Sequence, residues 1–192
     1  MAESGTEQGN VRLTLNRASL KQLLCVLPDS KAHLVFWSLL AAGLALDLWS
    51  KKAIFDWLKP YETFPVIEGF LQFVPALNNG AAFGWFAGKA WLLAPVSAVA
   101  IAVILGFFLL SGSRSRLVHV ALGLFAAGVC GNLYDRIFNG GAVRDFIDVY
   151  YRGYHWHTFN AADTLLCIGV GLLIIATSFI EKPARKRDPQ QK

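Results

Sequence analysis

One uncharged stretch constrains the fold of this chain more than any other feature of its sequence. Residues 90–110, AWLLAPVSAVAIAVILGFFLL, run without a single charged side chain. As a helix, this stretch would match the hydrocarbon core of a bilayer, which takes roughly 17–25 apolar residues to cross. Only 16% of the chain is charged and 55% is hydrophobic, whereas soluble domains carry about 25% charged residues. The sequence therefore predicts an α-helical integral membrane protein.

Three further stretches are long and mainly apolar, at residues 32–54, 117–133 and 164–180, and the first of them carries Asp47, Lys51 and Lys52 toward its end. We therefore expect four transmembrane helices, which together make up a membrane domain over residues 32–181. The rest of the chain divides into two terminal segments, an N-terminal extension (1–31) and a basic tail (182–192).

The basic residues indicate how these helices are oriented. Of the 18 Lys and Arg residues, 11 lie before the first stretch, between the second and third, or after the fourth. Cytoplasmic loops are enriched in Lys and Arg. We therefore expect both termini in the cytoplasm, with the connectors 56–89 and 134–162 on the extracytoplasmic face. The 11 residues are Arg12, Arg17, Lys21, Lys31, Arg114, Arg116, Lys182, Arg185, Lys186, Arg187 and Lys192.

The two outer connectors differ in pattern. Residues 56–89 alternate aromatic and β-branched residues between Pro and Gly, which predicts short strands or a hairpin lying on the membrane. Residues 134–162 are rich in Gly, Asp and aromatics, and we expect an aromatic loop that lies at the headgroup level. The predicted fold is thus four transmembrane helices plus a small extracytoplasmic β-rich segment.

Polar residues gather near the outer ends of the predicted helices. Ionisable groups at membrane depth are costly, so such residues are candidates for a functional site. The candidates are Asp47, Lys51, Asn78, Asn132, Asp135, Arg136, Asp145, Asp148, Asn160 and Asp163.

Several of these residues also have a simpler structural interpretation. Asp47 and Lys51 lie four apart on one helix face and form an ion pair in that interpretation. Asp163 then serves only as a first-turn acid that the helix dipole favours, and Asn160 as the N-cap of the same helix. For Asp148, the simplest interpretation is a loop acid that faces water.

Two other kinds of site are disfavoured. The net charge of +5 does not indicate nucleic-acid binding, because the basic residues lie at the ends of apolar runs rather than on one patch. His155 and His157, with Asp163 nearby, have a spacing that only weakly suggests zinc. We expect no metal and no other cofactor, and we interpret these histidines as interfacial side chains.

With these two kinds of site disfavoured, catalysis by a pair of carboxylic acids remains as the candidate chemistry. Two aspartates held close together cannot both ionise easily, so the pair shares a proton over a broad pH range. The charged member can act as a base toward water, while the protonated member donates to the carbonyl oxygen under attack. Such a pair would hydrolyse a peptide bond without a metal ion or a covalent intermediate.

Five segments follow one another along the chain: 47-DLWSK-51, 78-NNGAAFG-84, 131-GNLYDR-136, 143-VRDFID-148 and 159-FNAAD-163. Taken in this order, they resemble the signature blocks of bacterial lipoprotein signal peptidases. The resemblance implies an aspartyl endopeptidase of the bacterial cytoplasmic membrane. Such an enzyme removes the signal peptide from diacylglyceryl-modified prolipoproteins just before the lipid-modified cysteine.

The resemblance also implies roles for individual residues. Asp145 and Asp163 would be the catalytic pair. The partners would be lipid-modified prolipoprotein signal peptides and membrane phospholipid, and we expect a monomer. The other matched residues would bind substrate (Asn78, Asn132, Arg136 and Asn160) or shape the site and contact lipid (Asp47, Lys51 and Asp135).

Some further expectations concern packing and alternatives. Residues 60–88, with Phe64, Phe70, Phe73 and Phe83, would form a cradle over the cut site, and the loop 146–159 a lid. Gly128 and Gly131 would permit close approach of a substrate helix or of neighbouring spans. The alternative function is a small multi-span transporter or channel, which would place charges in mid-span or in broken helices.

Overall fold

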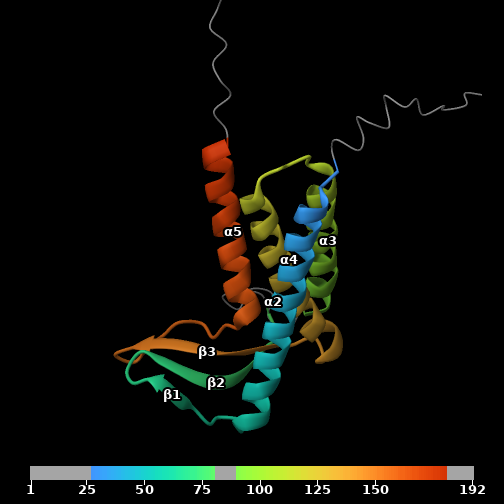
Figure 1. The fold of residues 1–192 in the computed structure, drawn as a ribbon. Coiled ribbons are helices and arrows are strands. Elements are labelled where there is room, and N and C mark those ends of the chain that lie inside the picture. The colour runs from blue at the N-terminus through green and yellow to red at the C-terminus, as the bar shows by residue number, and fades with distance from the viewer. Residues whose placement is uncertain (1–26, 81–89, 181–192) are drawn as a thin grey trace, which may run out of the picture.

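The computed structural model describes residues 27–80 and 90–180, which form a helix bundle with a small sheet at one end (Figure 1). The sheet lies beside the lower half of the helix that begins the described chain. The start of that first helix and the end of the last helix lie at the opposite end of the bundle. The elements are α2 (Ser30–Trp57), β1 (Phe64–Ile67), β2 (Leu71–Asn78), α3 (Ala90–Leu110), α4 (Arg116–Phe138), β3 (Val143–Tyr151), β4 (Tyr154–His155) and α5 (Ala161–Ile180).

Four helices in the described residues are long and apolar enough to cross a membrane, which confirms the predicted fold class. The helix α3 has the predicted bounds, and α2 and α5 extend theirs by two or three residues. The largest difference is at α4, which continues to Phe138 and so carries Asp135 and Arg136 as helical residues. The sequence prediction ended this helix before its charged residues. In the structure Asp135 is buried and paired with Lys51 and Arg144, so the helix continues past it.

The helix α4 lies at the centre of the bundle and packs against α2, α3 and α5. Small residues make this possible, because a side chain at Gly128 would collide with the backbone oxygen of Ala162 and with Leu166 in α5. A side chain at Gly131 would meet Asp47 of α2 and Ala162. The predicted close approach of neighbouring spans at these two glycines is confirmed.

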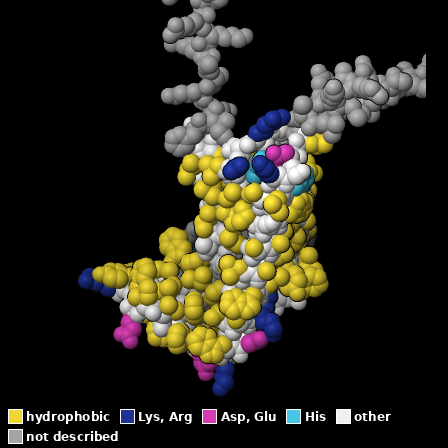
Figure 2. Space-filling model, in the orientation of Figure 1, with side chains coloured by type: hydrophobic (Ala, Val, Ile, Leu, Met, Phe, Trp, Pro, Cys, Tyr) yellow, Lys and Arg dark blue, Asp and Glu magenta, His cyan; other side chains and the backbone are white. Residues whose placement is uncertain are grey.

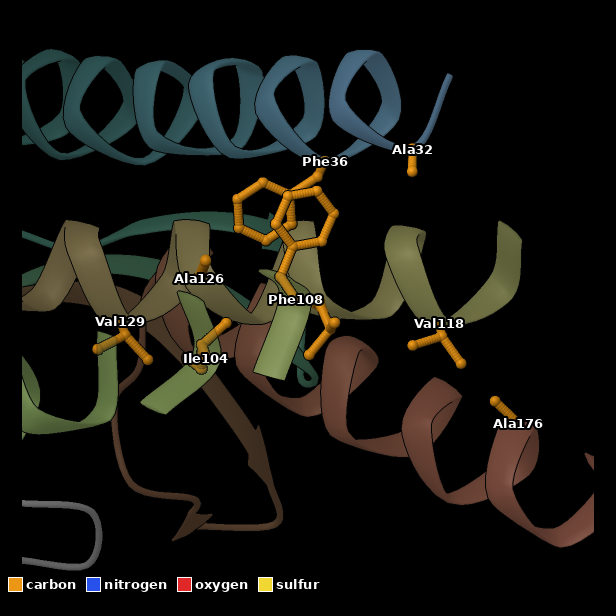
Figure 3. Packing of buried hydrophobic residues seen from close by; sticks show 9 residues of the cluster. Ala32, Phe36, Ile104, Phe108, Val118, Ala126, Val129 and Ala176 are labelled. Atoms are coloured by element: carbon orange, nitrogen blue, oxygen red, sulfur yellow. The ribbon is translucent and has the colours of Figure 1, made fainter. Parts of the chain in front are cut away.

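The half of the bundle away from the sheet has an apolar core (Figure 3). Phe36 of α2 stacks on Phe108 of α3, with ring centroids 4.1 Å apart. Around this pair lie Ala32, Ile104, Val118, Leu122, Ala126, Val129 and Ala176, which we call the inner core. The outer surface of the bundle is apolar as well, and charged side chains gather at its two ends (Figure 2). This distribution suits a molecule surrounded by lipid.

The sheet is antiparallel with strand order β1-β2-β3-β4. The predicted hairpin in residues 56–89 is confirmed by β1 and β2. The register between β2 and β3 is interrupted between Phe73 and Ala76, a stretch that contains Pro75. Proline has no N–H to donate, and in sheets it is confined to edges and such irregularities.

The prediction of an aromatic loop over residues 134–162 missed β3. Residues 146–151, assigned to a lid, belong to this strand, which pairs with β2. Its buried positions include Asp145 and Asp148, and these acids interrupt the apolar alternation by which a strand is recognised. Phe83, most of the N-terminal extension and the basic tail lie outside the described residues.

Candidate active site

Buried polar side chains converge where the bundle meets the sheet. They come from α2, α4, β3 and the start of α5, so the candidates spread along the sequence are brought together in space. Burying charges in this way requires that each be paired or hydrogen-bonded. The buried members are Asp47, Lys51, Asn132, Asp135, Asp145, Asp148 and Asn160.

Lys51 is the cation at the centre of this cluster. Its Nζ lies 2.7 Å from Oδ2 of Asp47 and 3.2 Å from Oδ2 of Asp135, and it donates to Oδ1 of Asn132 at 3.2 Å. The predicted ion pair with Asp47 is present, but it lies in the interior, with both side chains fully buried. Asp47 also accepts a hydrogen bond from the backbone N–H of Ala162, so the pair joins α2 to the first turn of α5.

Asp135 joins α4 to the strand β3. Its Oδ1 accepts from Nε and from the terminal guanidinium nitrogen of Arg144, at 3.1 and 2.6 Å. Its Oδ2 accepts from the backbone N–H of Arg144 at 2.9 Å. The contact fixes the backbone of Arg144, and the next residue is Asp145. Asp135 therefore helps to position the first of the two predicted catalytic acids. Sequence reasoning missed Arg144, whose only signal was its place inside the VRDFID block.

Asp145 is 1% exposed and accepts two amide hydrogen bonds. Nδ2 of Asn160 donates to its Oδ1 at 2.7 Å, and Nδ2 of Asn78 donates to its Oδ2 at 3.0 Å. Burial, followed by repulsion from the nearby carboxylate of Asp163, raises the pKa of Asp145 to about 7. The two amide hydrogen bonds and the charge of Lys51 act in the opposite direction. This acid therefore holds its proton close to neutral pH.

Asp163 lies in the first turn of α5 and caps that helix together with Asn160. Oδ1 of Asn160 accepts from the backbone N–H of Asp163 at 2.9 Å, while Oδ2 of Asp163 accepts from the N–H of Asn160 at 3.2 Å. This reciprocal arrangement is a capping box. It confirms Asn160 as an N-cap and Asp163 as a first-turn acid. Oδ1 of Asp163 also accepts from Nδ2 of Asn132 at 2.8 Å.

The two acids line one cavity of about 710 Å³. Asn160 links them from behind, because its side chain donates to Asp145 and its backbone donates to Asp163. Arg136 also lines the cavity, and its buried Nε has no hydrogen-bond partner among the described residues. The cavity is further lined by Asn78, Asn132, Leu77, Val143, Phe159 and Leu166.

Four predicted site residues lie behind the cavity and not in its wall. Asn160, Asp47, Lys51 and Asp135 are fully buried. Because the side chains of Asp47 and Lys51 are fully buried, they offer no surface for the predicted lipid contact.

The interpretation of Asp148 as a water-facing loop acid is wrong. Its side chain is buried, and its Oδ2 accepts from Nε2 of Gln72 at 2.6 Å and lies 2.8 Å from Nδ1 of His155. Gln72 and Asp148 are opposite one another across β2 and β3, so the pairing of the strands brings them together. Within residues 27–80 and 90–180, no three His, Cys, Asp or Glu side chains are arranged to hold a metal ion.

Known proteins with similar sequences and structures identify the family of this chain. Residues 39–179 match the family described as Signal peptidase (SPase) II. A lipoprotein signal peptidase from Geobacter sulfurreducens is 37% identical over 155 residues, which cover 79% of this chain and 95% of that protein. One from Yersinia pestis is 39% identical over 150 residues, which cover 74% and 87%.

A solved structure described as a bacterial membrane enzyme, determined by the in meso method at 2.3 Å resolution, is similar with a TM-score of 0.72 and 31% identity. The match covers 82% of this chain and 93% of that one. A second bacterial membrane enzyme structure, at 1.9 Å resolution, gives a TM-score of 0.67 at 32% identity. The family match runs from within α2 almost to the end of α5, and relatives at 37–39% identity cover about three quarters of the chain, so this chain belongs to the signal peptidase II family.

Proposed function

We propose that this chain is a membrane-embedded aspartic endopeptidase that removes the signal peptide from diacylglyceryl-modified prolipoproteins just before the lipid-modified cysteine. One observation carries the proposal. Asp145 and Asp163 face the same cavity, and Asn160 is hydrogen-bonded to both. Such a pair can hold one proton between two acids and so supply a base and an acid at once.

The raised pKa of Asp145 supports an assignment of the two roles. Asp145 carries the proton near neutral pH, so we assign Asp163 the role of the base. Asp163 takes a proton from a water molecule as the water oxygen attacks the peptide carbonyl carbon, and Asp145 gives its proton to the carbonyl oxygen. When the resulting gem-diol collapses, the C–N bond breaks. The proton on Asp163 passes to the leaving nitrogen, and a hydroxyl proton returns to Asp145.

Substrate contacts follow from the cavity wall. The buried Nε of Arg136 has no partner among the described residues and is available to a carbonyl or phosphate oxygen of the substrate. Asn78 lies at the end of β2 and donates to Asp145, which puts this end of the strand next to the reacting group. An unwound segment of signal peptide beside the end of β2 would find donors and acceptors that a lipid surrounding lacks.

The location of the site follows from the charge distribution. The sheet end of the bundle is the extracytoplasmic end, and both termini lie in the cytoplasm, because the opposite end carries the excess of Lys and Arg. The enzyme then meets its substrate in the bacterial cytoplasmic membrane, where the diacylglyceryl group confines it. Membrane phospholipid surrounds the enzyme, which acts as a monomer.

A cleavage assay with a lipid-modified prolipoprotein, in detergent or in liposomes, tests the proposal. Asp145→Asn and Asp163→Asn should each lower the rate by at least about a thousandfold, because each removes a proton-transferring group. Asp56→Asn is the matched control, since Asp56 is an exposed acid of α2 that pairs with Lys52. Cleavage near the wild-type rate by either active-site variant would refute the pair.

The alternative of a small transporter or channel receives no support. The relatives described above are signal peptidases, and the buried ions lie where the bundle meets the sheet.

A further inference from the structure

A second cavity, of about 670 Å³, lies at the other end of the bundle. Its walls come from the segment that begins α2 and from the link between α3 and α4, together with the first turn of α4. Figure 2 shows Lys, Arg and His side chains gathered at this end of the molecule. The lining divides into a basic group, Lys31, Arg114 and Arg116, and an apolar group, Leu27, Pro28, Ala32, Leu34 and Val35.

Among the described residues that line this cavity, the basic side chains outnumber the acidic ones. Within the part of the chain that the structure describes, Lys31, Arg114 and Arg116 take part in no ion pair. One acid, Asp29, lines the same cavity. Its Oδ1 already accepts from the backbone N–H of Ala32 at 2.7 Å, as the N-cap of α2. Three cations against one acid leave the cavity with a positive charge that an anion can neutralise.

The cavity wall is held in place by a buried histidine. Nε2 of His119 donates to the backbone oxygen of Ser113 at 3.0 Å, and its ring meets the ring of Phe108 edge-on at 5.8 Å. His119 is 5% exposed, so the link that carries Arg114 is fixed to the bundle. The backbone that carries Arg114 is therefore fixed beside the cavity, and the exposed side chains of Lys31, Arg114 and Arg116 line its rim.

The position of the cavity selects the kind of anion. Two spanning helices, α2 and α4, begin here, so the cavity lies at the level of the lipid phosphates. Its apolar wall continues onto surface that faces lipid, because the side chain of Leu34 is 69% exposed. A free phosphate ion would gain nothing from such a wall, but a phospholipid can place its phosphate on the cations and an acyl chain against Leu34.

We infer that this cavity binds the headgroup phosphate of an anionic phospholipid from the leaflet at the basic end of the bundle. Basic pockets between membrane helices bind anionic headgroups in this way. The orientation of a membrane protein explains why Lys and Arg lie on this side, but it does not require them to surround a cavity with an apolar wall. The inference is independent of the peptidase activity, since the two cavities share no lining residue.

Native mass spectrometry of the full-length chain in a neutral detergent tests this site. Phosphatidylglycerol is titrated against the wild type, a triple variant Lys31→Gln, Arg114→Gln, Arg116→Gln, and a control triple variant Lys52→Gln, Lys59→Gln, Arg152→Gln. The control removes the same charge from exposed residues outside both cavities. Wild type and control should retain one phosphatidylglycerol, and the cavity variant should bind it at least about tenfold more weakly.

Two further arms identify the source of the phosphate. Phosphatidylglycerol should raise the unfolding temperature of the wild type and the control but not of the cavity variant, whereas phosphatidylcholine and inorganic phosphate should leave all three unchanged. Unchanged cleavage by the cavity variant shows that it is folded. Equal retention of phosphatidylglycerol by both triple variants would overturn the site. Stabilisation by inorganic phosphate as large as that by phosphatidylglycerol would overturn the assignment to a lipid.

Discussion

The two halves of this bundle are built from the same helices but are packed by opposite means. In the half away from the sheet, the inner core contains only apolar side chains, with Phe36 stacked on Phe108. In the half next to the sheet, the interior contains an ionic cluster around Lys51, which contacts Asp47 and Asp135. The helix α4 passes through both halves, so one helix supplies alanines to the first and polar residues to the second.

The difference shows where this fold tolerates change. Apolar packing has little directionality, so a similar side chain can replace another at modest cost. An ionic cluster in a dry interior depends on every partner, because removal of one leaves another charge buried and unpaired. The polar half also holds the two acids in a fixed geometry, which an apolar interior would not provide.

Replacing Lys51, the central cation of the polar half, should destabilise the protein. Lys51→Met keeps the length of the side chain but leaves Asp47 and Asp135 without their shared cation. We expect a loss of about 3–5 kcal/mol in the free energy of unfolding, the range found when a buried ion pair loses one partner. Denaturant or thermal unfolding in detergent measures it.

The adjacent lysine is the control for this change. Lys52 pairs with Asp56 on the surface, where both side chains are more than half exposed. Lys52→Met should therefore leave stability nearly unchanged, because exposed ion pairs contribute little. Similar losses of unfolding free energy in Lys51→Met and Lys52→Met would mean that the ionic cluster around Lys51 does not stabilise this half of the bundle.

The polar half should also make the activity depend on pH. The pKa of Asp145 is raised to about 7, so this acid is protonated below that value and ionised above it. The proposed mechanism needs one proton on the pair. As pH rises through about 7 the pair loses that proton, and cleavage should fall by up to about tenfold per further pH unit. Measurements of kcat/KM between pH 6 and 9 check this. A rate that is constant or rising up to pH 8.5 contradicts the assignment of the proton to Asp145.

A small truncation in the inner core should have a limited effect. Ile104→Val removes one methylene group from a buried side chain of α3. We expect a loss of about 0.5–1.5 kcal/mol in stability, with cleavage unchanged because Ile104 does not line the active-site cavity. Unfolding and cleavage measured on the same preparation separate the two effects. A large loss of activity at unchanged stability would show that the halves are coupled.

Removal of metal ions should have the smallest effect. The proposed reaction uses two carboxylic acids and water, so dialysis against EDTA should leave the cleavage rate unchanged. Loss of activity that added zinc restores would instead favour a metal site that includes His155 or His157. Cleavage before and after dialysis, with calcium-saturated EDTA as the control, decides between them.

Many residues of the candidate site could be predicted, but the contacts that support them could not. Asp145, Asp163, Asn132 and Asn160 are candidates because polar residues near the ends of apolar stretches stand out, and the family resemblance singles out Asp145 and Asp163 as the pair. Arg144 was missed and Asp148 was placed in water, since their partners, Asp135 on α4 and Gln72 on β2, are chosen by tertiary packing. The spacing of these residues along the chain predicts neither contact.

The sequence by itself determined the four membrane helices, because the bilayer sets their length and excludes charge from their middle. Only the tertiary structure decided that β3 lies beside β2, that Lys51 is held between two acids, and that Asp145 and Asp163 share one cavity. The physical reason is that hydrophobic length is a property of a segment, whereas the pairing of a buried polar group depends on residues that only the folded chain brings within hydrogen-bonding distance.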